Sequence, residues 1–252
     1  IGIDTTNGKL VLTLPLSEGY QVYKIKALIE DIRGKGVLTI RKGQDTDDNG
    51  LPTGWTVNNL SSPAGSTSWF QGNPTVFDAH QGAANSYLAA NFNNGSSVSD
   101  ISTWLILPTS TYRNGDTLSF FTRTAELSLW ADNLEVRFSN VGGTDVGNSA
   151  GSVGTFSTLL LSVNPSLGLF GYPETWTQYS VTLSGLSNAT TGALAFRYLV
   201  GDGGPNGNNS NFIGIDTVNI TSAVPEPGTY MMLGMGLGML GFLRMRKRKH
   251  QA

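Results

Sequence analysis

The sequence contains no cysteine and only two histidines, His80 and His250. A chain without cysteine forms neither disulfide bonds nor metal sites with thiolate ligands, and two histidines are too few for a histidine-rich zinc site. Histidine is also the most frequent general acid or base in enzymes. The composition therefore excludes the usual zinc sites and leaves little room for acid–base catalysis.

Basic residues are scarce in the middle of the chain. Residues 44–223 contain four Lys or Arg and thirteen Asp or Glu, whereas residues 1–43 contain seven and four, and residues 224–252 contain five and one. The net charges are therefore −9 in the middle, +3 before it and +4 after it. A surface this acidic repels phosphate backbones. We expect no nucleic-acid partner; the charge suits an exported domain or one that meets cations.

The C-terminal tail has an uncharged segment, Gly228 to Leu243, directly before a cluster of basic residues. As a helix, these sixteen residues would span about 24 Å, somewhat short of a ~30 Å hydrocarbon layer. Basic side chains at the end of the segment can reach the membrane interface and reduce the mismatch. They are Arg244, Arg246, Lys247, Arg248 and Lys249. The pattern predicts a single transmembrane helix with a cytoplasmic C-terminus, and a buried core helix is the weaker alternative.

A stiff tripeptide, Pro225-Glu226-Pro227, follows Val224 and stands just before this segment. Two prolines around one residue hold the backbone extended and keep it out of a helix. The order of Val-Pro-Glu-Pro, a short apolar span and a terminal basic cluster resembles the PEP-CTERM sorting signal of Gram-negative bacteria. The resemblance implies cleavage near the tripeptide by a membrane exosortase. It also implies transfer to the cell surface or to the exopolysaccharide matrix.

The body of the chain has the pattern of an all-β protein. Short runs with alternating or β-branched and aromatic side chains are separated about every ten residues by Gly, Asn, Ser and Pro clusters. The predicted strands are 86–92, 101–107, 117–124, 134–139, 155–163, 177–183, 193–200 and 212–221. Strands of this size and number predict two packed antiparallel sheets in a jelly-roll-like β-sandwich.

Several motifs of the body, in this order, resemble the choice-of-anchor J family, which is related to cleaved-adhesin and MAM-like sandwiches. They are Leu51 to Val57, Ser68 to Gly72, Asn85 to Phe92, Ser102 to Ile106, Asp116 to Arg123, Trp176 to Tyr179, Arg197-Tyr198 and Ile213 to Asp216. The resemblance implies an exported jelly-roll sandwich with no assigned activity. Residues 1–43 do not match it. We therefore expect an N-terminal segment without an assigned role (1–43), a β-sandwich (44–222) and a sorting and anchor segment (223–252).

Carboxylates near both ends of the sandwich are candidate calcium ligands. The sequence from Asp45 to Gly50 satisfies the first half of an EF-hand loop, but Thr56 replaces the bidentate glutamate at the twelfth position, so a solvated turn is the better interpretation. Related sandwiches, as the resemblance implies, hold a cation between early and late carboxylates. The corresponding positions are Asp47 or Asp48 and Asp216, and Asp202 could add a further oxygen.

Tryptophans are the most informative aromatic residues. Four of the five lie in apolar runs typical of a sandwich core, but Trp130 stands beside Asp132 and Asn133 and is the candidate for ligand binding. Catalytic candidates are weak. His80 is the only candidate base in the body, and Asp132 and Glu135 could form a glycosidase pair only if the fold placed them across a cleft.

These observations favour an exported protein without catalytic activity. We expect an exosortase substrate that is adhesive or structural at the cell surface or in the biofilm matrix of a Gram-negative bacterium. The alternative is a lectin-like module in which Trp130 contacts exopolysaccharide. A glycan-active hydrolase is the third hypothesis.

Overall fold

The structure is a computed structural model, and it describes residues 2–4, 11–13 and 51–223. In the N-terminal segment, β1 (Gly2–Asp4) pairs with β2 (Val11–Thr13) in an antiparallel ladder. The described residues contain one short 3₁₀ helix, η2 (Phe92–Asn94), and no helix of theirs has the length and apolar character of a membrane span. The transmembrane helix expected at residues 228–243 lies outside the described residues.

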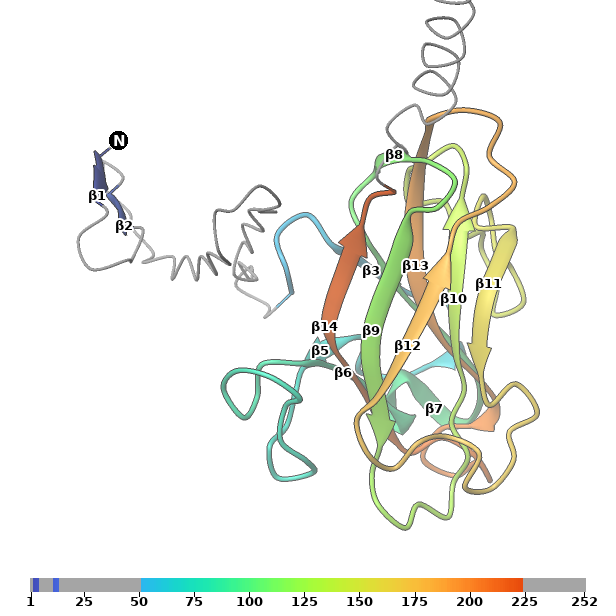
Figure 1. The fold of residues 1–252 in the computed structure, drawn as a ribbon. Helices are drawn as coiled ribbons and strands as arrows, with labels where there is room; N and C mark the ends of the chain where they lie inside the picture. The colour runs from blue at the N-terminus through green and yellow to red at the C-terminus, as the bar shows by residue number, and fades with distance from the viewer. Residues whose placement is uncertain (1, 5–10, 14–50, 224–252) are drawn as a thin grey trace, which may run out of the picture.

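Residues 51–223 form two antiparallel sheets, and this confirms the predicted all-β sandwich (Figure 1). The larger sheet has the order β11-β10-β13-β7-β3, with β4 also paired to β7 and β8 to β13. Its strands are β3 (Thr56–Asn59), β4 (Ser62–Ala64), β7 (Gly95–Ile106), β8 (Ser110–Tyr112), β10 (Leu134–Ser139), β11 (Thr158–Val163) and β13 (Thr190–Gly203).

The smaller sheet has the order β12-β9-β14-β6-β5. Its strands are β5 (Phe70–Gln71), β6 (Leu88–Asn91), β9 (Thr117–Thr124), β12 (Thr177–Thr182) and β14 (Phe212–Thr221). Three predicted strands, 117–124, 134–139 and 212–221, have the bounds that the structure gives. The strands that were not predicted are β3, β4, β5 and β8, which have only two to four residues. Runs this short carry too little alternation to be recognised.

The core lies between the sheets because alternate side chains of each strand point inward. In β9, Leu118 and Phe120 are buried, whereas Phe121 and Arg123 on the other face are half-buried. Phe120 meets Phe196 of β13 edge to face, with ring centroids 4.9 Å apart, so this pair joins the two sheets. The alternation predicted from the sequence is therefore the one that builds the core.

Long loops cover part of each outer face. The loop of residues 72–87 packs Phe77 and Tyr87 against the smaller sheet, where Gly214 leaves room for their rings. The loop of residues 140–157 packs Phe156 against Trp104 of the larger sheet. The sandwich therefore has covered faces, and its remaining loops gather at its two ends.

The two ends of the sandwich differ in what they carry. Because neighbouring strands are antiparallel, the segments after β9, β11 and β13 emerge at one end, where η2 also lies; we call this the loop end (Figure 1). The segments 113–116 and 183–189 lie at the opposite end. Ala223, the last described residue, donates from its backbone N–H to Asp116 Oδ1 there, at 2.7 Å. We call this the tail end.

Candidate functional site at the loop end

The loop end concentrates exposed apolar side chains. Five large hydrophobic residues are exposed in the segments that follow β9 and β11, namely Leu127, Leu129, Trp130, Leu169 and Phe170. Trp130 is 48% exposed, and each of the other four tryptophans is less exposed. Trp69 and Trp104 are buried, as expected, whereas Trp55 and Trp176 are only half-buried.

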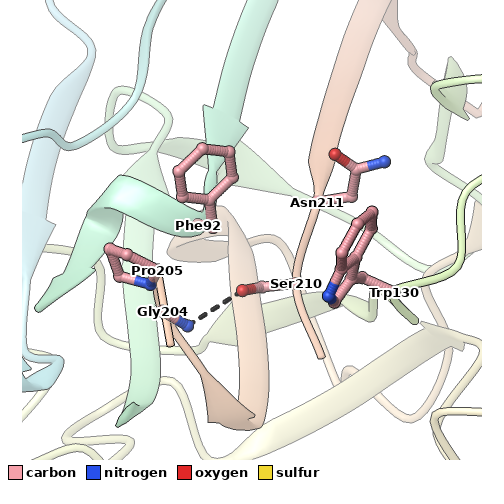
Figure 2. Close-up of a pocket in the computed structure, with 6 residues that line it drawn as sticks. All are labelled: Phe92, Trp130, Gly204, Pro205, Ser210 and Asn211. Atoms are coloured by element: carbon pink, nitrogen blue, oxygen red, sulfur yellow. Dashed lines mark hydrogen bonds between the residues drawn. The ribbon is translucent and has the colours of Figure 1, made fainter. Parts of the chain in front are cut away.

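A pocket of about 200 Å³ lies beside Trp130. It is lined by Phe92, Trp130, Gly204, Pro205, Ser210 and Asn211, none of which carries a charge (Figure 2). The Phe92 ring and the Gly204-Pro205 turn lie on one side and the Trp130 ring on the other (Figure 2). Ser210 lies between the turn and Trp130, and its Oγ accepts a hydrogen bond from Gly204 N at 2.9 Å. The pocket thus combines residues from η2, the β9–β10 loop and the β13–β14 loop.

Asp132 fixes the position of the loop that carries Trp130. Its carboxylate is fully buried and accepts hydrogen bonds from Thr124 Oγ1 at 2.7 Å, Tyr198 Oη at 2.6 Å and the backbone N–H of Asn211 at 2.8 Å. These donors belong to β9, β13 and the pocket itself. One buried side chain therefore ties the Trp130 loop to both sheets.

Burial shifts the pKa values of Asp132 and of two nearby tyrosines. Removal from water raises the pKa of Asp132 above its ordinary value, and the three hydrogen bonds lower it only in part. The pKa values of Tyr198 and Tyr172 are raised well above the usual range, again chiefly by burial. The hydrogen bonds of Asp132 come from neutral groups, and neutral donors offset the desolvation of a buried carboxylate less well than a cation would.

Further hydrogen bonds hold the backbone around Trp130. Ser128 Oγ donates to the carbonyl of Trp130 at 2.7 Å and accepts from Asn211 Nδ2 at 2.8 Å. The N–H of Ser210 donates to the carbonyl of Ala131 at 2.8 Å. The N–H of Phe92 donates to the carbonyl of Asn211 at 2.9 Å, so both walls of the pocket are connected through one backbone.

The two predicted calcium ligands that the structure describes, Asp202 and Asp216, lie in different sheets. Asp202 is exposed at the end of β13, where its Oδ2 accepts from Asn208 Nδ2 at 2.7 Å. Asp216 is buried in β14 of the other sheet and accepts from the backbone N–H groups of Gln81 and Thr217. Within residues 51–223 no three His, Asp or Glu side chains are grouped as metal ligands. Asp47 and Asp48 lie outside the described residues, so structural calcium stays a prediction.

The carboxylate pair considered for glycoside hydrolysis does not face a common cleft. Glu135 lies on the outer face of the larger sheet and pairs with Arg137 at 2.7 Å and with Arg197 at 3.2 Å. Asp132 bonds to Tyr198, which follows Arg197 in β13 and therefore points to the opposite, inner face. The exposed His80 contacts Thr217 Oγ1 through its Nδ1 at 3.0 Å and stacks on Phe121.

The candidate sorting residues, Val224 to Pro227 and the basic cluster from Arg244 to Lys249, lie outside the described residues. Residues 223–249 match the family described as the PEP-CTERM protein-sorting motif. The chain carries a PEP-CTERM sorting motif. Such a motif marks an exported protein that is anchored in the membrane by its C-terminus before processing, and it implies processing by an exosortase.

Solved structures resemble the sandwich. The K1 cleaved adhesin domain of Lys-gingipain from Porphyromonas gingivalis W83 is 22% identical, with a TM-score of 0.50 over 71% of this chain and 97% of that domain. The K3 domain of the same protein is 22% identical, with a TM-score of 0.48 over 70% and 94%. A carbohydrate-binding module of the β-sandwich superfamily is 12% identical, with a TM-score of 0.44 over 76% and 70%. No curated protein sequence matches the chain. At these identities, the first likeness shows the fold alone.

Sequence reasoning missed most of the pocket that surrounds Trp130. Phe92 is the last residue of the predicted strand 86–92, and Asn211 belongs to no predicted strand or motif. Their contacts depend on pairing between β6 and β14, where Phe212 lies opposite Asn91. The available signal is the β13–β14 loop, which is rich in Gly and Asn.

Proposed function

We propose that the protein is a non-catalytic adhesive or structural component of the cell surface or the biofilm matrix of a Gram-negative bacterium. In this proposal an exosortase cleaves the chain near Pro225-Glu226-Pro227 and releases the sandwich from its membrane anchor. The sandwich then contacts matrix material with its loop end.

The proposal rests on one observation: the sorting motif and the candidate site lie at opposite ends of the sandwich. The sorting motif begins at residue 223, and Ala223 is bonded to the tail end through Asp116. The exposed apolar side chains and the pocket lie at the loop end, one strand length away. At about 3.3 Å per residue, the ten residues of β14 extend over roughly 33 Å. Before cleavage, while it is anchored at its tail end, the sandwich would therefore hold the loop end away from the membrane, and after cleavage the loop end would stay free for contact.

A second candidate function is carbohydrate binding at the loop end. It is favoured by the pocket beside Trp130, because aromatic rings joined with a few polar groups are typical of small-molecule sites. This function is compatible with the first, since an adhesive protein of the matrix needs a contact with polysaccharide.

The sorting step is tested by replacing both prolines of the motif in native cells. We expect the double variant Pro225→Ala, Pro227→Ala to remain unprocessed in the membrane, because alanine lets the helix extend through the cleavage region. The measurement is the mass of the C-terminal peptide of the mature protein together with its cellular location. Pro165→Ala, in an exposed loop outside the motif, is the control and should be processed normally. Normal processing and location of the double variant would refute the proposal.

A further inference from the structure

The pocket beside Trp130 has the size of one small ring. Its volume of about 200 Å³ is smaller than the ~300–1,000 Å³ usual for drug-sized ligands. Phe92 and Trp130 bound it on two sides, and the Gly204-Pro205 turn bounds it on a third (Figure 2). A pocket of this volume, bounded on three sides, has room for a single terminal unit.

Two polar groups at the pocket have no hydrogen-bond partner among residues 51–223. Trp130 Nε1 is a donor on the side of the indole ring that faces Ser210 (Figure 2). Asn211 Oδ1 is an acceptor, because Asn211 uses its Nδ2 to bond Ser128 and its backbone groups to bond Asp132 and Phe92. One donor and one acceptor between two aromatic rings match a hydroxylated ring, which has both apolar C–H faces and hydroxyl edges.

The charge of the surroundings excludes an anion. None of the six lining residues is charged, and residues 44–223 carry a net charge of −9. An anionic ligand would lose its hydration without gaining a cationic partner. A carboxylate or phosphate is therefore disfavoured, and a neutral ligand is favoured.

We propose that this pocket binds one uncharged sugar unit, the terminal residue of a neutral glycan. The sugar unit lies between the edge of the Trp130 indole and Phe92, one hydroxyl accepts from Trp130 Nε1, and another donates to Asn211 Oδ1. This inference rests on the second candidate function and specifies its ligand class. It adds that the contact is made with glycan ends and not along the chain.

The test is a titration of the full chain with simple glycosides. The protein is kept in a detergent without a sugar headgroup, and binding is measured by saturation-transfer difference NMR. The probes are the methyl glycosides of glucose, galactose, mannose and N-acetylglucosamine, with methyl glucuronide as the charged counterpart of the first. We expect at least one neutral probe to bind with a dissociation constant on the order of 1 mM, and the glucuronide to bind at least tenfold more weakly.

Three variants assign the binding to the pocket. Trp130→Phe keeps a ring but loses the Nε1 donor, and we expect about fivefold weaker binding. Trp130→Ala removes the platform, and we expect at least tenfold weaker binding. Phe170→Ala is the matched control, because Phe170 is an exposed aromatic residue of the same end that does not line this pocket, and binding should stay within about twofold.

Two results would overturn the inference. One is the absence of binding by every neutral probe at concentrations about tenfold above the expected constant. The other is binding that Trp130→Ala and Phe170→Ala weaken equally, since this would indicate nonspecific contact with exposed apolar side chains. Both results are independent of export, which is measured separately by the processing of the proline variants in cells. Failure of the pocket and failure of the proposed export and processing are thus distinguishable.

Discussion

At the scale of single residues, Asp132 connects segments that are distant in the sequence. Thr124, Tyr198 and Asn211 all donate to it, and its own carbonyl accepts from Asn164 Nδ2 at 2.9 Å. Burial raises the pKa of the Asp132 carboxylate, and its three hydrogen bonds, all from neutral groups, lower it only in part. The stability of the loop end should therefore depend on pH.

The first prediction compares Asp132→Asn with Asp132→Ala. The asparagine Oδ1 can keep the bonds from Tyr198 and Asn211. Its Nδ2 can donate to Thr124 Oγ1, whose single hydrogen is then free for the carbonyl of Phe212, at 3.0 Å. We expect Asp132→Asn to unfold with nearly the wild-type free energy at pH 5. Asp132→Ala leaves buried donors without partners and should cost about 3 kcal/mol.

The pH dependence has a definite sign. Because the pKa of Asp132 is raised in the folded state, the folded protein binds more protons than the unfolded chain above about pH 4. The wild type should therefore lose free energy of unfolding as the pH rises through that raised pKa, and Asp132→Asn should lose less. Urea denaturation at pH 5 and pH 8 measures the difference. Parallel losses in both proteins would contradict the assignment.

At the scale of elements, the covering of the outer faces depends on positions without side chains. A Cβ atom on Gly214 of β14 would lie 2.9 Å from ring atoms of Phe77, Tyr87 and Trp176. These three rings also pack against one another, with centroids 5.1 to 5.6 Å apart. The loop of residues 72–87 can therefore lie flat on the smaller sheet only because β14 has a glycine there.

The second prediction concerns this contact. Gly214→Val should destabilise the sandwich by about 1 to 3 kcal/mol, because its Cβ would lie 2.9 Å from atoms of three rings, which must shift to make room for it. It should also expose residues 72–87 to limited proteolysis. Gly151→Ala is the control: an added Cβ there meets no atom within 4 Å, so its free energy of unfolding should change by less than about 0.5 kcal/mol. Equal resistance of both variants to protease would argue against the role of Gly214.

At the scale of the whole molecule, the tether and the candidate site lie at opposite ends. Ser166 is exposed in the β11–β12 loop at the loop end, and Ser187 is exposed in the β12–β13 loop at the tail end. Since the chain has no cysteine, a single introduced cysteine is a unique attachment point for a fluorophore. The arrangement can therefore be measured directly.

The third prediction uses these two positions in proteoliposomes that contain the full chain. A fluorophore on Ser187→Cys should transfer more energy to an acceptor dye in the membrane than one on Ser166→Cys, because the two ends are roughly 30 Å apart along the strands. Unlabelled wild-type protein treated with the same reagent serves as the control. Equal transfer from both positions would show that the sandwich does not stand on its tail end.

The sequence by itself determined the longer strands of the sandwich and the C-terminal signal. Alternation along a strand is a local property, so Thr117 to Thr124 could be recognised without knowledge of its partners. The same holds for the sorting motif, whose parts follow one another in the chain. The exposed Trp130 could be singled out because its polar neighbours differ from those of a core tryptophan.

Only the tertiary structure decided what surrounds Trp130 and how far the site lies from the tether. Phe92, Trp130 and Asn211 are separated by 38 and 81 residues, and they meet because β6 and β9 both pair with β14. The structure also shows that Asp132 and Glu135, three positions apart, make contacts on opposite faces of the larger sheet, Asp132 with Tyr198 and Glu135 with Arg197. Such relations depend on strand order and register, which result from packing between distant segments and leave no pattern in any local stretch of sequence.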